Sequence, residues 1–353
     1  MKKIVLITGS SGLVGSEASL FFLSKGYRVL GIDNNERKNL FGTIADTNWK
    51  KKELLRFSNF NHYNINICNK VKLNEIFKKF KNKIVLIIHC AAQPSHDWAY
   101  KEPIKDFNIN ALGTLNILEA FKKYCPRSKF IHMSTNKVYG DNPNKIEFIE
   151  KKSRWELSKK NIYYDGFKEN FNIDNCVHSL FGVSKLYSDI IVQEYGKNFN
   201  LDTVVFRAGC ITGPNHSGAK LHGFLSFLVK SCITKKKYEI IGYKGKQVRD
   251  NIHSIDLVNC FWQFFLNSKK KGEVYNIGGG RFSNCSVIEA LNYVEKKLNI
   301  KVKKKIISKP RVGDHMWYIT NNEKFSKDFP NWKQQYNTKR ILDEIILSIK
   351  IKF

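Results

Sequence analysis

The first thirty-three residues constrain the fold of this chain more than any other stretch. Residues 4–7 form a short apolar run, rich in β-branched side chains, of the kind that makes a buried parallel strand. A glycine-rich turn, TGSSGLVG (8–15), follows directly, and apolar residues then recur with helical spacing up to Gly26. A second apolar run over 27–32 ends in Asp33. This order of strand, turn, helix, strand and acid predicts a βαβ unit.

The glycine turn is suited to hold the diphosphate of a dinucleotide. Glycines let the backbone turn tightly and approach phosphate oxygens, and the N-terminus of the following helix attracts anions. Asp33 lies about twenty residues further on, where a carboxylate accepts hydrogen bonds from ribose hydroxyls. It also repels a 2′-phosphate, so NAD is favoured over NADP, although Arg37 nearby is a cation that suits such a phosphate. The alternative is a turn that binds nothing, and the position of Asp33 argues against it.

The strong positive charge of the chain raises the question of a nucleic-acid or membrane partner. There are 60 basic and 31 acidic residues, with a formal net charge of +29. Only ten of the basic residues are Arg, and the Lys residues are scattered in short clusters such as 50–52 and 235–237. We therefore expect a solvated lysine-rich surface and no nucleic-acid partner. The positive field would instead attract a substrate that carries a diphosphate.

Cysteine usage and hydropathy predict a cytoplasmic protein. The eight cysteines include no CxxC pair, and several lie in apolar runs, as expected for reduced thiols rather than disulfides or a zinc site. No cluster has metal-ligand spacing, so no metal is expected. The apolar run after Met1 is cut short by the glycine turn, which argues against a signal peptide. No stretch of about eighteen apolar residues occurs, so no membrane partner is expected.

Further alternating elements extend the first unit into an α/β domain. Strands are expected at 62–67, 83–89, 129–133, 203–207 and 273–277, and helices at 71–80, 106–124, 180–199, 222–232 and 287–298, with a basic strand at 301–307. The pattern predicts a Rossmann-type doubly wound parallel sheet that binds ligands at the carboxyl ends of its strands. A smaller C-terminal α/β lobe is expected to bind the substrate.

Changes in the pattern define the expected domains. We assign 1–206 to the dinucleotide-binding domain, with the polar and aromatic segment 141–175 as a lid and 246–278 returning to the same domain. Residues 207–245 and 279–353 then form the substrate-binding lobe.

Several motifs together identify a family resemblance that covers nearly the whole chain. They are Gly9-x-x-Gly12-x-x-Gly15, Ala91-Ala92, Asn110 to Thr114, Ser134-Thr135 with 138–140, Gln247 to Asp250, and Tyr275 to Gly279. The chain resembles the extended short-chain dehydrogenase/reductases, specifically their NAD-dependent sugar-nucleotide epimerases and dehydratases. Within this family, the long loop before the predicted 180–199 helix and the segment 213–218 are most similar to the CDP-paratose 2-epimerase branch.

The resemblance implies a reaction and its ligands. In such epimerases a tyrosine phenolate, four residues before a lysine, takes a hydroxyl proton while NAD takes hydride from the same sugar carbon. The ketone then turns its other face toward the cofactor, and the hydride returns to that face. The lysine holds the nicotinamide ribose and lowers the pKa of the phenol, and a Ser or Thr hydroxyl, here Thr135, bonds the reacting oxygen. The implied partners are NAD, a nucleotide-diphosphate sugar and a second copy of the chain, paired through helices 106–124 and 180–199.

The glycine turn and the resemblance together assign the ligand contacts. The cofactor contacts are Gly9, Ser11, Gly12, Leu13, Val14, Gly15, Asp33, Asn34, Asn66, Ile67, Ala91, Ala92, Gln93, Asn110 and Lys185. The substrate contacts are Asn215, His222, Arg249 and Arg311. The two Arg residues are expected to clamp the diphosphate because a guanidinium fork matches phosphate oxygens. The alternative for them is an ion pair with Asp250 or Asp314.

The catalytic segment departs from the family at one position. It reads HSLFGVSK (178–185), so Lys185 is present but Phe181 stands where the tyrosine is expected. A phenyl ring accepts no proton, and the loss of a general base costs about 10²–10⁴-fold in rate. One explanation is that Tyr163 or Tyr164 of the lid supplies the phenol.

A second explanation makes His178 or Cys176 the base. His178 would share a helix face with Phe181 if the helix began early enough. In the third explanation the protein binds NAD and a sugar nucleotide without turnover, or catalyses different chemistry such as net oxidation. Our catalytic set is therefore Thr135, Lys185, Tyr164 and His178.

Two neighbouring substitutions help to choose among the reactions of the family. Asn136-Lys137 replaces the Asp-Glu pair of the 4,6-dehydratases, which argues against a dehydratase. Cys210 replaces an Asn found in many relatives. We therefore predict an NAD-dependent epimerase of nucleotide sugars.

Overall fold

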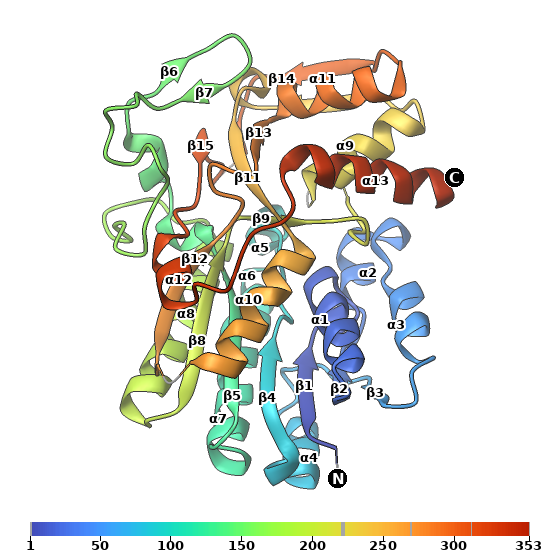
Figure 1. Ribbon diagram of the computed structural model, residues 1–353, viewed down its shortest axis with the longest axis vertical. Helices are drawn as coiled ribbons and strands as arrows, with labels where there is room; N and C mark the ends of the chain where they lie inside the picture. The colour runs from blue at the N-terminus through green and yellow to red at the C-terminus, as the bar shows by residue number, and fades with distance from the viewer. Residues whose placement is uncertain (1, 220–222, 269, 312, 353) are drawn as a thin grey trace. The chain divides into compact units, whose positions relative to one another are not determined.

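The computed structural model describes residues 2–219, 223–268, 270–311 and 313–352 (Figure 1). Within these ranges the main sheet has seven strands in the order β12-β8-β5-β4-β1-β2-β3. The pairings of β1 with β2 and β4, of β2 with β3 and of β4 with β5 are all parallel. The chain therefore starts in the middle of the sheet and winds outward in both directions, which confirms the predicted Rossmann-type fold.

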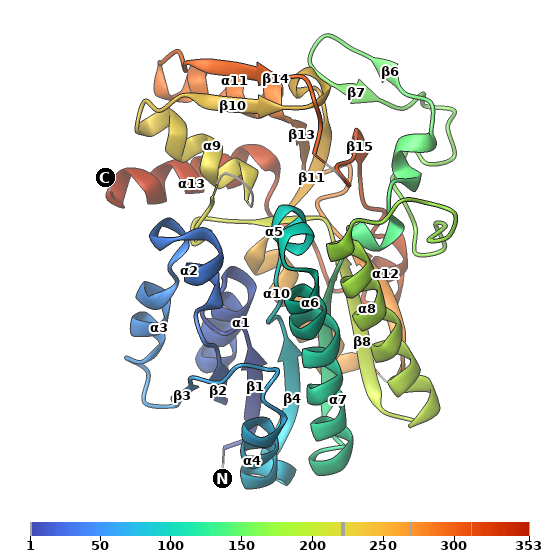
Figure 2. The same ribbon diagram turned by 180° about the vertical axis from the view of Figure 1, so that it is seen from behind.

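The strands of this sheet are short and buried. They are β1 (Ile4–Thr8), β2 (Arg28–Ile32), β3 (Phe60–Tyr63), β4 (Ile84–His89), β5 (Lys129–Thr135), β8 (Asp202–Ala208) and β12 (Glu273–Ile277). All five residues of β1 are buried, because helices cover both faces of a parallel sheet. Helices α1 and α10 lie on one face (Figure 1), and α7 and α8 lie on the other (Figure 2).

The helices around this sheet follow the apolar periodicity of the sequence. They are α1 (Leu13–Ser24), α2 (Glu36–Phe41), α3 (Asn48–Leu54), α4 (Lys70–Phe80), α5 (His96–Lys101), α6 (Pro103–Phe107), α7 (Gly113–Tyr124), α8 (Leu180–Asn198) and α10 (Ser254–Asn267), with short 3-10 turns at Thr43–Ala45 and Lys81–Lys83. Aromatic contacts join two of them, since Trp262 of α10 meets the rings of Phe21 and Phe22 of α1. No helix in the described ranges is long and apolar enough to span a membrane.

Three predicted elements differ from the structure. The third strand is Phe60–Tyr63, not 62–67, because its pairing with β2 ends at Tyr63 and the chain then turns. Between Asp33 and β3 the polar sequence predicts a loop with one short helix, whereas the structure has two helices, α2 and α3. The predicted helix 106–124 begins earlier, at Pro103, and includes a π-helical segment, Asn108–Leu112. Such segments often occur at functional sites, and this one carries Asn110.

The chain divides into two compact units. Unit 1 comprises 1–138, 180–207 and 258–275, and unit 2 comprises 139–179, 208–257 and 276–353. This differs from the predicted domains in two places. The expected lid belongs to unit 2, because Phe167 N donates to Ile319 O and Trp155 N donates to Lys246 O. Of the segment expected to return to the first domain, only 258–275 does so.

Unit 2 is built on a small mixed sheet. Its central strand is β11 (Val248–His253), which is antiparallel to β13 (Asn284–Ser286) and parallel to β9 (Cys210–Thr212) and β15 (Trp317–Tyr318). The other elements are β6 (Ile149–Glu150), β7 (Trp155–Glu156), β10 (Tyr238–Ile241), β14 (Lys304–Ile307), α9 (Phe224–Ile233), α11 (Val287–Leu298), α12 (Glu323–Asp328) and α13 (Thr338–Lys352), with 3-10 turns at Asn142–Lys145 and Tyr243–Gly245. A further 3-10 turn, Asn136–Tyr139, lies mostly in unit 1.

An apolar core joins the helices of unit 2. The predicted helix 222–232 and strand 301–307 correspond to α9 and β14, each with a later start. Leu228 of α9, Leu291 of α11 and Ile345 of α13 are fully buried in one cluster.

Candidate active site

The turn between β1 and α1 is built around two glycines that admit no side chain. Gly9 has a φ of +68°, and a Cβ there would lie 2.8 Å from the backbone N of Ala91. A Cβ on Gly15 would lie 2.1 Å from the carbonyl O of Gly9. Both positions therefore require glycine for the turn itself and for the close approach of the turn to the loop after β4.

Gly12 is less constrained, because a Cβ there would make one tight contact rather than overlap the backbone. A Cβ at Gly12 would meet a single neighbouring atom, the Gly9 carbonyl O at 3.3 Å. Gly12 is the N-cap of α1 and has no side chain with which to cap the first N–H groups, including those of Leu13 and Val14. An anion can therefore reach this helix end closely, so the loop fits a dinucleotide diphosphate.

Asp33 is held as a hydrogen-bond acceptor at the end of β2. Its Oδ2 accepts from Ser11 N at 2.9 Å, and its Oδ1 accepts from Asn35 N at 2.7 Å. The carboxylate thus closes the glycine turn and retains lone pairs for ribose hydroxyls. Arg37 lies with its guanidinium 5.2 Å from the centre of the Phe41 ring, and burial lowers the pKa of Arg37 to about 10.

The predicted cofactor residues Asn34, Asn66 and Ile67 lie on loops after β2 and β3. Asn34 donates to Glu36 from its amide at 3.4 Å. Asn66 follows β3 and accepts from Cys68 N at 2.9 Å, while Ile67 is buried under Gly113. These contacts shape the loop after β3, at the end of the sheet where Asp33 also lies.

The loop after β4 is fixed by a buried amide network. Gln93 N donates to Asn110 Oδ1 at 2.9 Å, and Asn110 Nδ2 donates back to Gln93 O at 3.0 Å. Asn110 Nδ2 also lies 3.0 Å from Asp106 Oδ1 and 3.1 Å from Ser184 Oγ. The loop bearing Ala91 and Ala92 is therefore tied both to the π-helical segment and to α8.

Lys185 lies buried at the end of β5. Its Nζ donates to Met133 O at 2.7 Å and lies 3.4 Å from His132 Nε2. Burial lowers the pKa of Lys185 to about 8. Thr135, the last residue of β5, lies two residues beyond Met133, and its Oγ1 accepts from Lys137 N at 3.3 Å. Lys185 and Thr135 therefore both lie near the carboxyl end of β5, and their role as a catalytic pair stays a prediction.

Two buried histidines behind Lys185 were not expected from the sequence. His89 bonds Thr8 Oγ1 at 2.7 Å and Thr114 Oγ1 at 2.9 Å, and its ring centre lies 5.2 Å from that of His132. Burial, with Lys185 nearby, lowers the pKa of His89 to about 3 and that of His132 well below its ordinary value. Both imidazoles are therefore neutral at physiological pH. Their place on adjacent parallel strands was the one sequence signal for this contact.

Phe181 occupies the second position of α8 and is buried. Its ring meets the imidazole of His96, the first residue of α5, with centroids 4.9 Å apart and planes at 64°. His178 precedes the helix, which begins at Leu180, so the helical turn that would have placed it beside Phe181 does not form. His178 Nε2 instead lies 2.9 Å from Ile173 O and 3.2 Å from Cys176 Sγ.

The other candidate bases belong to unit 2. Burial, together with Asp141, raises the pKa of the Cys176 thiol. The Tyr164 ring is covered by the Arg281 guanidinium, whose central carbon lies 3.8 Å from the ring centre, and Arg281 Nε donates to Tyr164 O at 2.6 Å. Tyr163 packs against Phe167 and Phe171. Both tyrosine rings thus take part in the packing of unit 2.

The predicted substrate residues also lie in unit 2. Arg249, on β11, is largely buried; its Nη2 lies 2.5 Å from Asp314 Oδ1, so the alternative of an ion pair is realised. Burial raises the pKa of the Tyr238 phenol, and the nearby charge of Arg311 acts in the opposite direction and lowers it. Asn215 lies in the turn after β9. His222 lies outside the described residues.

The buried carboxylate of Asp250, which the sequence offered only as part of a motif and as an ion-pair partner for an arginine, organises unit 2. Asp250 Oδ2 accepts from Gly280 N at 3.1 Å and Thr320 N at 3.0 Å. Burial raises the pKa of Asp250 to about 6. Asp250 therefore joins three segments of backbone, which is a structural role. In the described part of the chain, no group of three or more His, Cys, Asp or Glu side chains is arranged to hold a metal.

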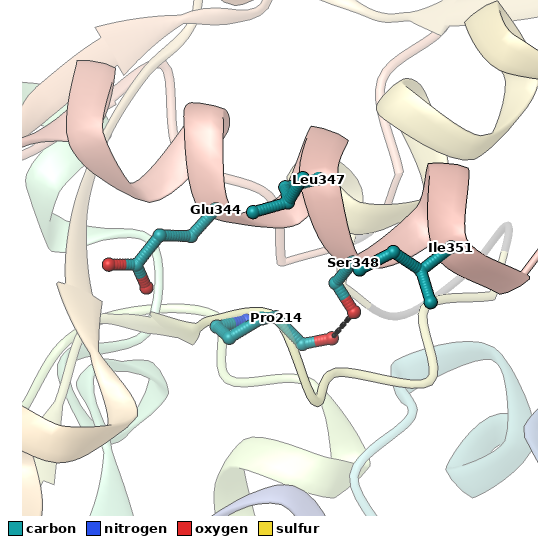
Figure 3. A pocket seen from close by; sticks show the side chains of 5 residues that line it. All are labelled: Pro214, Glu344, Leu347, Ser348 and Ile351. Atoms are coloured by element: carbon teal, nitrogen blue, oxygen red, sulfur yellow. Dashed lines mark hydrogen bonds between the residues drawn. The ribbon is translucent and has the colours of Figure 1, made fainter.

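One hollow of unit 2, with a volume of about 360 Å³, lies against α13 (Figure 3). Its walls are Pro214, Glu344, Leu347, Ser348 and Ile351. Ser348 Oγ donates to Pro214 O at 2.9 Å across it. Among the described residues the walls are mostly apolar and offer no cation for a phosphate, so we assign this hollow no part in binding a nucleotide sugar.

Comparisons with known proteins agree with the geometry. The NAD dependent epimerase/dehydratase family matches residues 5–278. CDP-paratose 2-epimerase of Salmonella typhi is 32% identical over 302 residues, which cover 84% of this chain and 85% of that protein. dTDP-D-glucose 4,6-dehydratase of Dictyostelium discoideum is 32% identical over 279 residues, which cover 78% of this chain and 58% of that protein.

Solved structures share the fold along the whole chain. Pal from Bacillus thuringiensis superposes with a TM-score of 0.82 at 20% identity, covering 99% of this chain and 100% of that one. UDP-glucuronic acid 4-epimerase from Bacillus cereus, in complex with UDP-glucuronic acid and NAD, superposes with a TM-score of 0.79 at 23% identity, covering 99% and 100%. The matched family is NAD dependent, and NAD is the dinucleotide that fits the glycine loop and Asp33.

Proposed function

Because the chain belongs to the NAD dependent epimerase/dehydratase family, we propose that it is an epimerase that inverts one carbon of a nucleotide-diphosphate sugar. The observation that carries this choice is the sequence after β5, where Thr135 keeps the catalytic hydroxyl while Asn136 and Lys137 replace the acid pair of the dehydratases. Asn136 is also buried, and an amide there supplies no proton for the loss of water. The family contains both kinds of enzyme, and this pair favours the epimerase.

The relatives support a finer proposal about the substrate. The two quoted curated relatives are equally identical to this chain, but the epimerase is matched over a larger share of its own length. We therefore propose a CDP-sugar as the substrate and carbon 2 as the centre of inversion. Arg249 and Arg311 would bind the diphosphate, which requires Arg249 to exchange Asp314 for a phosphate oxygen.

The roles of the side chains in unit 1 follow from their positions. NAD, when bound, accepts a hydride from the sugar carbon and returns it to the other face. The Thr135 hydroxyl orients the reacting oxygen, and the Lys185 ammonium holds the nicotinamide ribose. Because burial lowers the pKa of Lys185 to about 8, this side chain also gives up a proton near neutral pH more readily than an exposed lysine does.

A second candidate function is a binding protein without turnover, and Phe181 is the observation that favours it. Its buried phenyl ring preserves the packing of α8 but supplies no base. A net oxidoreductase that releases NADH is the alternative within the enzymes. The three functions predict different fates for bound NAD, so one set of assays separates them.

The test is to incubate the purified protein with CDP-, UDP- and GDP-sugars and follow the sugar protons by NMR. Inversion of one carbon, with no accumulation of NADH, supports the epimerase. NADH that accumulates with an oxidised sugar supports the oxidoreductase. Tight NAD binding without any change in a sugar supports the binding protein and contradicts our proposal.

We also propose that the protein is a homodimer and acts in the cytoplasm. Large side chains of the helices named for pairing remain exposed on unit 1, among them Phe107, Leu112, Val183, Tyr187 and Ile190. The rings of Phe107 and Tyr187 lie 6.0 Å apart, so they form one patch across α6 and α8. A second copy would cover it. The cytoplasmic assignment is supported by the eight free cysteines. Light scattering of wild type and of Tyr187→Glu tests the dimer, since the charge should yield monomers.

A further inference from the structure

We propose that the imidazole of His96 is the general base that takes the hydroxyl proton of the sugar, in place of the phenol that Phe181 lacks. This inference rests on the proposed function, because it assigns the base of that same epimerase site. His96 was not among the bases considered from the sequence, in which it lies 85 residues before Phe181.

The first argument is the direct contact of the two rings. Centroids 4.9 Å apart with planes at 64° describe an edge-to-face contact in which the atoms touch. A tyrosine at 181 would carry its hydroxyl on this same ring. His96 therefore lies against the side chain that bears the base in the resembled family. It is half-buried rather than enclosed, so a substrate can approach it.

The second argument is that one polar network holds both rings. The Gln93 amide donates to Ser95 O at 2.9 Å and to Asp106 Oδ1 at 2.6 Å, and Ser95 N bonds the other end of the same amide. These bonds fix the backbone directly before His96. Such a buried and connected network restricts the motion of the groups it joins.

The network continues into α8 on the other side. Asn110 links Gln93 to the Ser184 hydroxyl, and Ser184 Oγ in turn donates to Phe181 O at 3.1 Å. Helix α5 packs against α8, as Figure 2 shows. The imidazole of His96 is thus held relative to the start of α8, which also carries Lys185 one turn later.

The third argument is the position of this contact within the catalytic end of unit 1. Lys185 follows Phe181 by one helical turn, and its Nζ bonds Met133 O, two residues before Thr135. Thr135, Lys185, Phe181 and His96 are therefore linked through short steps of backbone and hydrogen bonds. His178 and Cys176 instead bond each other outside α8.

The chemistry of imidazole suits the step. A neutral imidazole nitrogen accepts a proton directly, whereas a phenol must first lose its own. It takes the hydroxyl proton and becomes imidazolium, while the C–H electron pair leaves as hydride to the bound cofactor and the C–O bond becomes a carbonyl. When the hydride returns to the other face, the imidazolium gives its proton back to the oxygen. No proton or electron is gained overall.

The experiment compares His96→Ala, Phe181→Tyr, the double variant and a matched control, Asp97→Asn, on the sugar nucleotide that wild type inverts. We expect His96→Ala to lose about 10²–10⁴-fold in kcat with NAD content and thermal unfolding unchanged. Free imidazole should restore part of the lost rate, and so should Phe181→Tyr in the double variant, because it returns a phenol beside Lys185. Asp97→Asn, next to His96 on α5, should keep the wild-type rate.

A second readout does not depend on turnover. Diethylpyrocarbonate modifies accessible imidazoles, and mass spectrometry locates the modified residue. CDP-glucose added to the NAD-loaded protein should protect His96 from this modification, because a bound sugar would cover it. Modification of His96 at the same rate with and without CDP-glucose would contradict the proposal.

The outcomes separate this proposal from the proposed function. If wild type inverts a sugar and His96→Ala does so at the same rate, His96 is not the base, although the epimerase stands. A slowed His96→Ala variant that neither imidazole nor Phe181→Tyr restores would also overturn the proposal, since it would indicate a structural role. If wild type inverts none of the CDP-, UDP- and GDP-sugars, the proposed epimerase function is wrong, and so is the role of His96 as its base.

Discussion

The cofactor side and the catalytic side of unit 1 differ in what they require of the sequence. The cofactor side depends on backbone geometry, since side chains at Gly9 or Gly15 would overlap neighbouring backbone atoms. The catalytic side depends on the identity of single functional groups. Phe181 fills a buried position at the start of α8 that a tyrosine ring would also fill. The first side carries the glycine motif of the resembled family, while on the second Phe181 stands where that resemblance predicts a tyrosine.

This difference teaches that a parallel sheet can keep its ligand site and change its chemistry at small structural cost. A phenolic hydroxyl is not part of the backbone hydrogen bonds of α8, so its absence removes none of them. The change therefore acts on the reaction rather than on the fold. The four predictions below test this contrast, from the largest expected effect to the smallest.

Gly15→Val should be the most damaging substitution on the cofactor side. The added Cβ would lie 2.1 Å from the Gly9 carbonyl O, so the turn must open. We expect a loss of more than about 4 kcal/mol in the free energy of unfolding, with loss of NAD binding. Gly26→Ala is the control: nothing lies within 4 Å of its Cβ, but φ is +82°. It should cost about 1–2 kcal/mol and keep NAD bound. Equal losses in the two variants would contradict the steric explanation.

Asp189→Ala should show that the catalytic side also has a rigid frame. The buried Asp189 carboxylate accepts from Ser134 Oγ at 2.5 Å and from Arg207 Nε at 3.0 Å, which joins α8 to β5 and β8. Removing it takes from the buried Arg207 guanidinium the carboxylate that it pairs with, at a cost of about 3–5 kcal/mol. Urea unfolding measures this cost. A loss below about 1 kcal/mol would mean that α8 is held mainly by apolar packing.

Lys185→Met should change the pH dependence of stability. Burial lowers the pKa of Lys185 from 10.5 to about 8, so between these values the unfolded chain binds the extra proton. Stability therefore rises with pH through this window, by roughly 3 kcal/mol at most, and is lost again as pH falls through about 8. The methionine variant should lack this rise. The free energy of unfolding is measured by urea at each pH. If it followed the same pH dependence in both proteins, the pKa of Lys185 would not be lowered by folding.

Phe181→Tyr should have the smallest effect on stability. The ring stays in place, and the free energy of unfolding should change by less than about 1.5 kcal/mol. The turnover rate should stay the same or rise, because a phenol beside Lys185 adds a second base. Steady-state kinetics measure this. A fall in rate of more than tenfold would mean that the phenyl ring itself shapes the site.

Local sequence patterns are sufficient to predict the cofactor side and the frame of the sheet. The order of strand, glycine turn, helix and Asp33 is contained in thirty-three residues, and the structure places Asp33 at the end of β2. Buried strands such as β4 and β5 follow from apolar runs. These features depend on neighbours in the sequence or on simple periodicity.

The remaining features depend on contacts between distant segments. Segment 139–179 belongs to unit 2 through hydrogen bonds such as Phe167 N to Ile319 O. The spacing of apolar residues along the sequence does not reveal such a contact. The third strand was placed too late because its pairing with β2 determines where it ends. The contact of His96 with Phe181 joins two helices that are far apart in the sequence. For the same reason, the sequence offered His178 as a base although α8 begins only at Leu180.

The most direct test of the central claim follows one deuterium atom. A CDP-sugar labelled with deuterium at carbon 2 is incubated with the NAD-loaded protein in ordinary water, and the product is analysed by NMR. We predict that carbon 2 is inverted, that it retains its deuterium, and that no NADH accumulates, because the hydride leaves and returns within one site. Inversion with loss of the deuterium to solvent, accumulation of reduced cofactor, or an unchanged sugar would contradict the account.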